Sequence, residues 1–111
     1  MDRIEQYRTL VEQTMNKYAR YKRADENVEV QLVLDKEHDH YRLSSVGWID
    51  QKRIRWDTLH IDIKNGKIWI QHDGTERGIA NELVDLGVPK QDIVLAFQAP
   101  YKRKYTDFAE N

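Results

Sequence analysis

Apolar and polar residues alternate on both sides of one turn signal in the middle of the chain. Asn65-Gly66 separates two apolar runs, and this residue pair favours the positive φ angles of a two-residue type I′ hairpin turn. The turn predicts a hairpin in which aliphatic residues from both strands share one face. The predicted register has three opposed pairs, Ile63 with Ile68, Ile61 with Ile70 and Leu59 with His72.

Two further segments before this hairpin carry strand patterns. Residues 28–35 alternate with period two, which is typical of a half-buried strand. In each of the next two strands the alternation slips by one residue, near Ser44-Ser45 in the first and near Asp57-Thr58 in the second. One extra residue produces such a slip, so we expect a β-bulge or a strong bend in both strands. The pattern as a whole predicts a four-stranded antiparallel meander.

The same slips admit a second interpretation, in which both faces of the sheet are partly apolar. The three tryptophans would then form an aromatic patch on the side away from the helices. Such a patch on a small protein more often marks a partner interface than a solvent-exposed surface. The candidate interface residues are Trp48, Trp56 and Trp69.

Helical periodicity appears before and after the meander. Asp2 and Glu5 form a capping-box pair at the start of an amphipathic stretch over residues 3–22. A second capping-box spacing begins at Asp73, and Gly87 ends the apolar stripe, so the pattern predicts a second helix over residues 75–86. Cations gather at the end of the first helix, before a polar linker over residues 23–27, and we interpret them as compensating the helix dipole rather than binding nucleic acid; they are Lys17, Arg20, Lys22 and Arg23.

The C-terminal part carries a short apolar run over residues 92–97, between Pro89 and Pro100. Its β-branched residues favour a buried strand, although periodicity alone also allows a helix. We expect the tail, residues 101–111, to pack one or two aromatic side chains onto the domain. The predicted fold class is α+β, with element order α-β-β-β-β-α, a final short apolar segment, and the helices on one face of the sheet.

Composition narrows the class of protein. The chain has 111 residues, of which 40% are hydrophobic and 33% charged, which suits a single domain over residues 1–111. The formal net charge of −1 provides no overall attraction for nucleic acid or for an anionic membrane. Cysteine is absent, so disulfides and thiolate chemistry are excluded. The N-terminus is charged from its second residue and no run reaches membrane-span length, so we expect a cytoplasmic protein.

Two polar clusters are candidates for a metal site. The first turn of the meander holds Asp35, Glu37, His38, Asp39 and His40, and His60 with Asp62 lies on one strand face. Neither cluster has the spacing of a recognised metal frame, and polar residues belong in turns for reasons of backbone chemistry. We interpret both clusters as hydrated surface and predict no metal and no cofactor. The sequence also lacks a nucleophile elbow and a phosphate-binding loop, so we do not expect an enzyme.

Basic residues next to aromatic residues suggest contact with nucleic acid. The pattern occurs in residues 101–105 and again around Trp56. These cations could neutralise phosphates, but the sequence has no signature of an element that enters a DNA groove, so direct DNA binding is not favoured. The candidate contacts are Arg53, Arg55, Lys102, Arg103 and Lys104.

Several short runs in a fixed order resemble one family over essentially the whole chain. They are residues 60–64 (HIDIK), 66–71 (GKIWIQ), 73–76 (DGTE), 82–84 (ELV), 87–90 (GVPK) and 92–95 (DIVL), followed by Phe97, Pro100 and Arg103. This series is similar to the XisI-like family, whose members are called fdxN element excision controlling factors. The chain departs from the family pattern at Ala96 and Gln98, where Gly and His are expected.

The resemblance implies a cyanobacterial accessory factor that acts with a site-specific recombinase and an XisH-like companion in the excision of a DNA element during heterocyst differentiation. It implies no active site. Our interpretation is therefore a non-enzymatic control factor that acts mainly through protein contacts and forms a homo-oligomer. The resemblance also allows an antitoxin-like partner of the companion, which resembles nucleases of the PD-(D/E)XK fold, and, as a further alternative, a direct DNA-binding protein.

Overall fold

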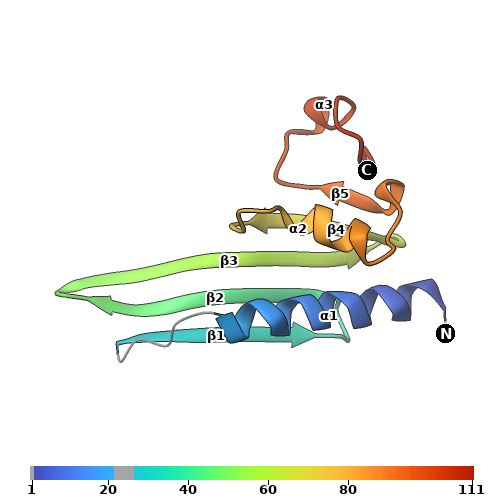
Figure 1. Cartoon of the computed structure of the whole chain (residues 1–111). Helices are drawn as coiled ribbons and strands as arrows, with labels where there is room; N and C mark the ends of the chain where they lie inside the picture. The colour runs from blue at the N-terminus through green and yellow to red at the C-terminus, as the bar shows by residue number, and fades with distance from the viewer. Residues whose placement is uncertain (1, 22–26) are drawn as a thin grey trace.

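The computed structural model describes residues 2–21 and 27–111, and it shows an elongated sheet with helices packed against it (Figure 1). Lys22, Arg23 and most of the predicted linker lie outside the described residues. The elements in chain order are α1 (Arg3–Tyr21), β1 (Val28–Asp35), β2 (His40–Ile49), β3 (Lys52–Lys64), β4 (Lys67–Asp73), α2 (Ile79–Asp85), the 3₁₀ turn η1 (Lys90–Asp92), β5 (Ile93–Leu95) and α3 (Pro100–Arg103).

Within the described residues the sheet has five strands in the order β1-β2-β3-β4-β5, so the prediction of a purely antiparallel four-stranded sheet is wrong in strand number and in the direction of the last strand. The first four strands form the expected antiparallel meander, and β5 pairs with β4 in parallel. Parallel neighbours need a crossover connection, and α2 with η1 supplies it. The apolar run predicted as a buried strand is therefore the end of a β-α-β unit.

The hairpin between β3 and β4 confirms most of the predicted register. Asn65 and Gly66 have φ values of 55° and 78°, as a type I′ turn requires, and the two isoleucine pairs form as expected. Leu59, however, lies opposite Asp73 and not His72. The register shifts between His60 and Ile61, because β4 contributes one extra residue there.

Only one of the two bulges predicted from the phase slips is present. Leu43 pairs with Leu59 while Ser44 pairs with Asp57, so Thr58 is the extra residue in β3, at the predicted place. β2 runs against β1 without any shift, so the bulge expected near Ser44-Ser45 is absent from β2. The slip in β2 instead arises because Val46 and Trp48 lie on the face opposite Tyr41 and Leu43, so this strand carries apolar residues on both faces, as the second interpretation allowed.

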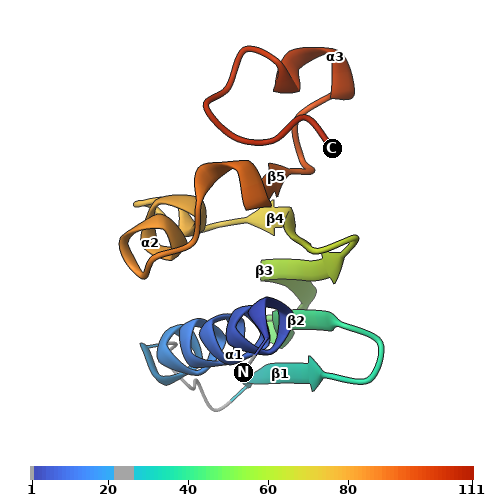
Figure 2. The same cartoon turned by 90° about the vertical axis from the view of Figure 1, so that its right-hand side faces the viewer.

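The helices α1 and α2 cover one face of the sheet, as predicted, and no helix in the described residues covers the other face (Figure 2). The helix-covered side is the inner face of the sheet, and the other side is its open face. At the start of α1, Asp2 accepts a hydrogen bond from the Glu5 backbone N–H at 2.9 Å, which confirms the Asp2 half of the predicted capping box, while the Glu5 carboxylate contacts Arg8. The core joins side chains from α1, α2 and the inner face, including Val11, Met15, Tyr41, Leu43, Leu59, Ile61, Ile70, Ile79 and Leu83.

The second helix is shorter than predicted. It begins at Ile79 rather than at residue 75, because the Asp73 carboxylate accepts hydrogen bonds from the backbone N–H groups of both Thr75 (2.9 Å) and Ile79 (2.8 Å) and so holds the segment between them outside the helix. Gly87, at φ 105°, ends the helix as expected, with its N–H bonded to Val84 and the N–H of Val88 bonded to Leu83.

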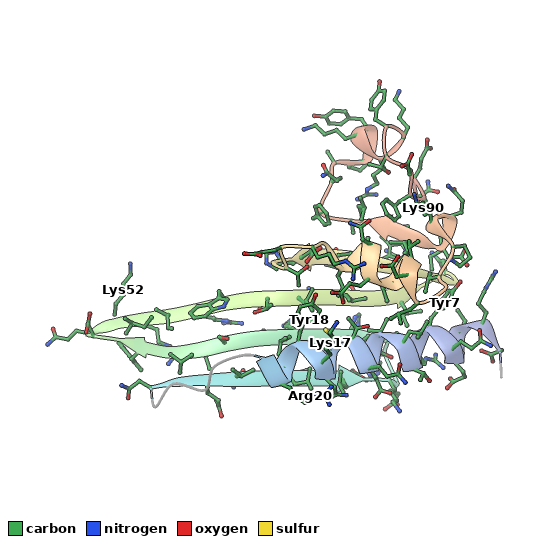
Figure 3. The ribbon with its side chains drawn as sticks, in the orientation of Figure 1. Tyr7, Lys17, Tyr18, Arg20, Lys52 and Lys90 are labelled. Atoms are coloured by element: carbon green, nitrogen blue, oxygen red, sulfur yellow. The ribbon has the colours of Figure 1, made fainter. Side chains whose placement is uncertain are left out.

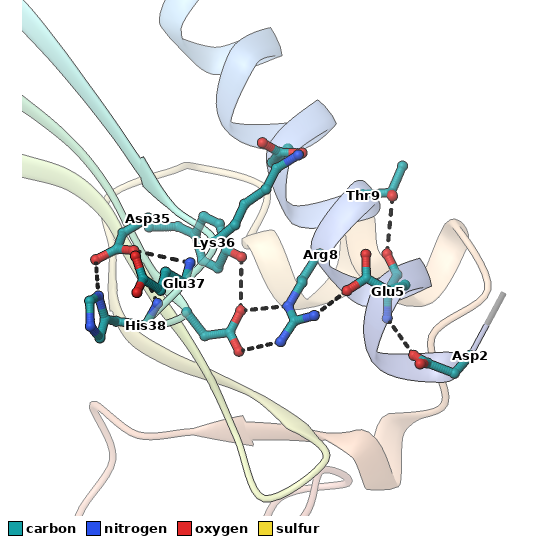
Figure 4. A network of polar contacts seen from close by, with 11 residues as sticks. Asp2, Glu5, Arg8, Thr9, Asp35, Lys36, Glu37 and His38 are labelled. Atoms are coloured by element: carbon teal, nitrogen blue, oxygen red, sulfur yellow. Dashed lines mark hydrogen bonds and ion pairs between the residues drawn. The ribbon is translucent and has the colours of Figure 1, made fainter.

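A polar network joins the start of α1 to the β1–β2 turn (Figure 4). Arg8 holds the Asp39 carboxylate with two hydrogen bonds, of 2.8 and 3.0 Å, and also contacts Glu5. The hydrogen bonds from the Arg8 guanidinium hold the pKa of Asp39 below its usual range. Part of the polar turn cluster is therefore occupied by contacts that hold the fold together.

None of the helices in the described ranges combines the length and the apolar character needed to cross a membrane.

Candidate interaction surface

The tip of the β2–β3 hairpin extends beyond the end of α1 (Figure 1). Trp48 and Ile49 are both 51% exposed there. The Arg53 guanidinium lies 5.6 Å from the centre of the Trp48 ring, in a cation–π contact. This tip therefore presents a large aromatic surface and a charged group to solvent.

The three candidate tryptophans do not form the single patch that one interpretation predicted. Trp56 lies opposite the buried Ser45 in the β2–β3 register, which places it on the inner face. Trp48 lies opposite Arg53, and Trp69 opposite Asp62. The positions of Trp48 and Trp69 are about 30 Å apart along β3, at about 3.3 Å per residue. The Thr58 bulge causes this arrangement, because it puts Trp56 and Leu59 on the same side of the sheet.

Trp69 is half-buried and closely held by its neighbours. Its indole N–H donates to the Lys64 carbonyl at 3.1 Å, and the Lys64 ammonium lies 4.0 Å from its ring centre. Arg103 lies 5.8 Å from the same ring and also donates hydrogen bonds to the carbonyls of Gln98 (3.0 Å) and Ala96 (3.1 Å). Trp69 and Arg103 thus fasten the C-terminal segment to the sheet.

The candidate DNA contacts lie in two separate places. Arg53 and Arg55 lie on β3, towards the hairpin tip, whereas Lys102, Arg103 and Lys104 lie in or just after α3. Figure 3 shows the separation through two labelled lysines, Lys52 at the hairpin end and Lys90 near the C-terminal segment. The structure therefore does not gather these cations on one face.

One functional candidate missed at the sequence level is Arg42. It lies on β2, and its side chain meets those of Arg53 and Arg55 around a hollow of about 350 Å³ on the open face. The alternation of β2 places Arg42 on the side opposite Tyr41, but only the register with β3 shows that the three arginines meet. This feature, called the arginine hollow below, is also lined by Gln31, Val33, Ser44 and Val46.

A second hollow, of about 300 Å³, lies between α1 and α2. Two of its cations already have carboxylate partners. Lys17 lies 3.8 Å from Glu82, and Arg77 contacts Asp85. The buried Glu82 also accepts a hydrogen bond from Tyr18, and burial together with this bond raises the pKa of Tyr18 to about 12. The contacts of Lys17 and Tyr18 with Glu82 join α1 to α2, whereas the Arg77–Asp85 pair lies within α2 and the segment before it.

The histidine clusters are occupied by local hydrogen bonds. His38 lies 3.0 Å from Asp35, while His40 and His60 lie 2.9 and 3.1 Å from the same oxygen of Asp62. Hydrogen bonds from the backbone and side chain of His38 lower the pKa of Asp35. Within residues 2–21 and 27–111, no group of three or more His, Cys, Asp or Glu side chains is arranged to hold a metal ion.

Comparison with known proteins identifies the family. The family model for XisI protein matches residues 1–110. The crystal structure of a XisI-like protein from Anabaena variabilis ATCC 29413 matches with a TM-score of 0.92 and 48% sequence identity, over 97% of this chain and 98% of that one. The crystal structure of the fdxN element excision controlling factor XisI from the same organism matches with a TM-score of 0.90 and 34% identity, over 99% and 100% of the two chains. No curated protein matches the chain. The resemblance read from the sequence is confirmed, and the chain belongs to the XisI family.

Proposed function

We propose that this chain is a control factor for the excision of a DNA element, and that it acts through contacts with other proteins rather than as an enzyme. The observation that carries the proposal is its likeness, along nearly its full length, to a relative whose name is fdxN element excision controlling factor XisI. A relative that matches over both complete folds supports the same kind of role for this chain. The role belongs in the cytoplasm, where chromosomal DNA is rearranged.

Features of the surface support protein contacts. Large apolar side chains are exposed at both ends of the molecule, with Trp48 and Ile49 at the hairpin tip and Phe97, Tyr101 and Tyr105 around α3. Aromatic residues next to arginine are enriched at protein interfaces. By contrast, the separation of the basic residues does not favour DNA binding, because a duplex is held by several phosphate contacts along one surface.

An excision reporter tests this function. A plasmid that carries the two recombination borders of an fdxN-type element is combined with its recombinase and an XisH-like protein, with or without this chain, and excision is measured by PCR across the joined ends. We expect excision to depend on the chain and to fall on Trp48→Ala but not on Leu86→Ala, a control at another exposed apolar residue. Equal excision without the chain would contradict the proposal.

A second candidate function is the restraint or guidance of an XisH-like nuclease-fold protein, as an antitoxin would act. The arginine hollow favours this candidate, because an uncovered arginine-rich sheet face suits a protein partner. Co-purification of the two proteins, with the mass measured by light scattering, tests it. A stable mixed complex is expected; a chain that stays apart from the XisH-like protein and self-associates would instead indicate a homo-oligomer.

A further inference from the structure

The arginine hollow differs from the other charged sites of the molecule. Its lining contains Arg42, Arg53 and Arg55 together with polar and aliphatic residues, and no described carboxylate lines it. All three arginines are exposed. Arg53 contacts the Trp48 ring, and neither Arg42 nor Arg55 forms an ion pair with a residue in the described part of the chain.

Several other cations of the fold have a carboxylate partner within the chain. Arg8 binds Asp39, and in the hollow between the helices Lys17 and Arg77 each have a carboxylate partner. Asp57, the carboxylate opposite Ser44 on the open face, accepts the Ser44 hydroxyl at 2.7 Å. Glu29, opposite Val46 on the same face, accepts a hydrogen bond from Gln31 at 3.0 Å. Three arginines thus line one hollow whose own lining contains no acid, with Glu29 and Asp57 beside it, and the excess of positive charge favours an anionic occupant.

The surroundings of the hollow indicate which anionic occupant fits. Val33, which is 53% exposed, and Val46 line the same hollow, and Trp48 lies next to it along β2. Apolar side chains next to guanidinium groups favour a protein segment as the occupant. Its carboxylates bind the guanidinium groups while its apolar residues pack on the valines. A DNA duplex would need phosphate contacts over a longer surface, and the cations of α3 lie elsewhere.

We propose that the arginine hollow binds an acidic segment of a partner protein, in which Asp or Glu carboxylates alternate with apolar residues. The inference rests on the proposed role through protein contacts and adds the chemistry of the partner. Arg42 and Arg55 bind the carboxylates, and the Trp48–Arg53 pair forms one wall of the site. An extended segment fits best, because its side chains alternate between the two sides with the period of a strand.

A fluorescence-anisotropy titration tests this proposal with three labelled probes: a peptide of alternating Glu and Val, its counterpart with Gln in place of Glu, and a short DNA duplex. The variants are Arg42→Gln and Arg55→Gln. The control is Lys52→Gln, which removes an equal charge from β3, the strand of Arg55, at an exposed position of the inner face. We expect the acidic peptide alone to bind, about tenfold more weakly with either arginine variant and unchanged with the control.

Three results would overturn the proposal: no preference for the Glu peptide over the Gln peptide, equal weakening by Lys52→Gln, or preferential binding of the duplex that depends on Arg42 and Arg55. The same variants in the excision reporter separate the two proposals. Chain-dependent excision that is unaffected by Arg42→Gln and Arg55→Gln would refute the acidic-segment site and leave the proposed function standing. Excision that does not need the chain would refute the proposed function whatever the peptide result.

Discussion

Gly47 lies where β1 begins to pair with β2, directly before the exposed Trp48, and its replacement by alanine tests how tightly this end of the sheet is packed. A Cβ atom added there would lie 2.1 Å from the Asn27 carbonyl oxygen and 2.7 Å from the Val28 Cα. Both neighbours are backbone atoms, so the chain itself has to move. The same carbonyl accepts the Trp48 N–H at 2.9 Å, and this hydrogen bond would be strained or lost.

The expected change in the free energy of unfolding combines two destabilising effects and one stabilising effect. Overpacking against a fixed neighbour costs about 1–3 kcal/mol, and loss of the hydrogen bond adds about 1 kcal/mol. Gly47 is not among the residues with positive φ, so alanine also reduces the entropy of the unfolded chain, which returns roughly 0.4–1 kcal/mol. Gly47→Ala should therefore lower the free energy of unfolding by about 2 kcal/mol.

Urea unfolding followed by tryptophan fluorescence measures this change. With a slope of about 1–3 kcal/mol per molar urea, the midpoint should fall by roughly 1 M. Gly66→Ala is a useful comparison, since a Cβ there meets nothing within 4 Å and only its φ of 78° resists the change, at roughly 1–2 kcal/mol. An unchanged or raised midpoint for Gly47→Ala would show that entropy dominates and that the predicted steric conflict does not exist.

Three further predictions concern charge and the C-terminal segment. Because Arg8 lowers the pKa of Asp39 below its ordinary 3.8, this carboxylate stabilises the fold above that pH and loses its contribution as pH falls through the lowered value. Asp39→Asn should therefore make the melting temperature fall less steeply as the pH is lowered. An unchanged dependence of melting temperature on acid pH would contradict the assignment. Burial and the Glu82 hydrogen bond raise the pKa of Tyr18 to about 12, so its contribution to stability is complete below about pH 10 and is lost as pH rises through 12. Tyr18→Phe should reduce this loss of stability at alkaline pH, as measured by thermal melts recorded across that range. Arg103→Ala removes the hydrogen bonds to Ala96 and Gln98, so limited proteolysis should cut residues 96–111 faster, and no affinity for DNA should be lost. A loss of DNA affinity with unchanged proteolysis would instead identify Arg103 as a DNA contact.

Much of the fold follows from interactions between residues that are close together in the sequence. The turn at Asn65-Gly66, the Asp2 cap and the helix end at Gly87 depend on neighbouring residues, and each is present in the structure. The direction of β5 was not predictable in the same way. Its three residues carry no information about their partner, and the parallel pairing depends on how α2 and η1 bring the chain back to β4.

The candidate surface was less predictable because it depends on which strand holds an extra residue. Two alternatives existed for the phase slips, a bulge or a two-faced sheet, and periodicity does not distinguish them. The structure has the bulge at Thr58 in β3 and none in β2 against β1, so Trp56 lies on the inner face and Trp48 on the open face. The arginine hollow likewise combines residues from β2 and β3, and only the register between these strands brings them together.

The chain after α3 returns to the sheet and has a protective effect there. Ala109 forms a bridge with Val94 and donates its N–H to the Ile93 carbonyl at 2.9 Å, while Lys67 of β4 contacts the carbonyl of Asn111. An uncovered last strand would be a template for pairing with another chain, and Ala109 occupies the middle of that edge on β5. A second molecule could extend the sheet on this side only after displacing its C-terminal end, so the tail directs any strand-to-strand aggregation away from β5.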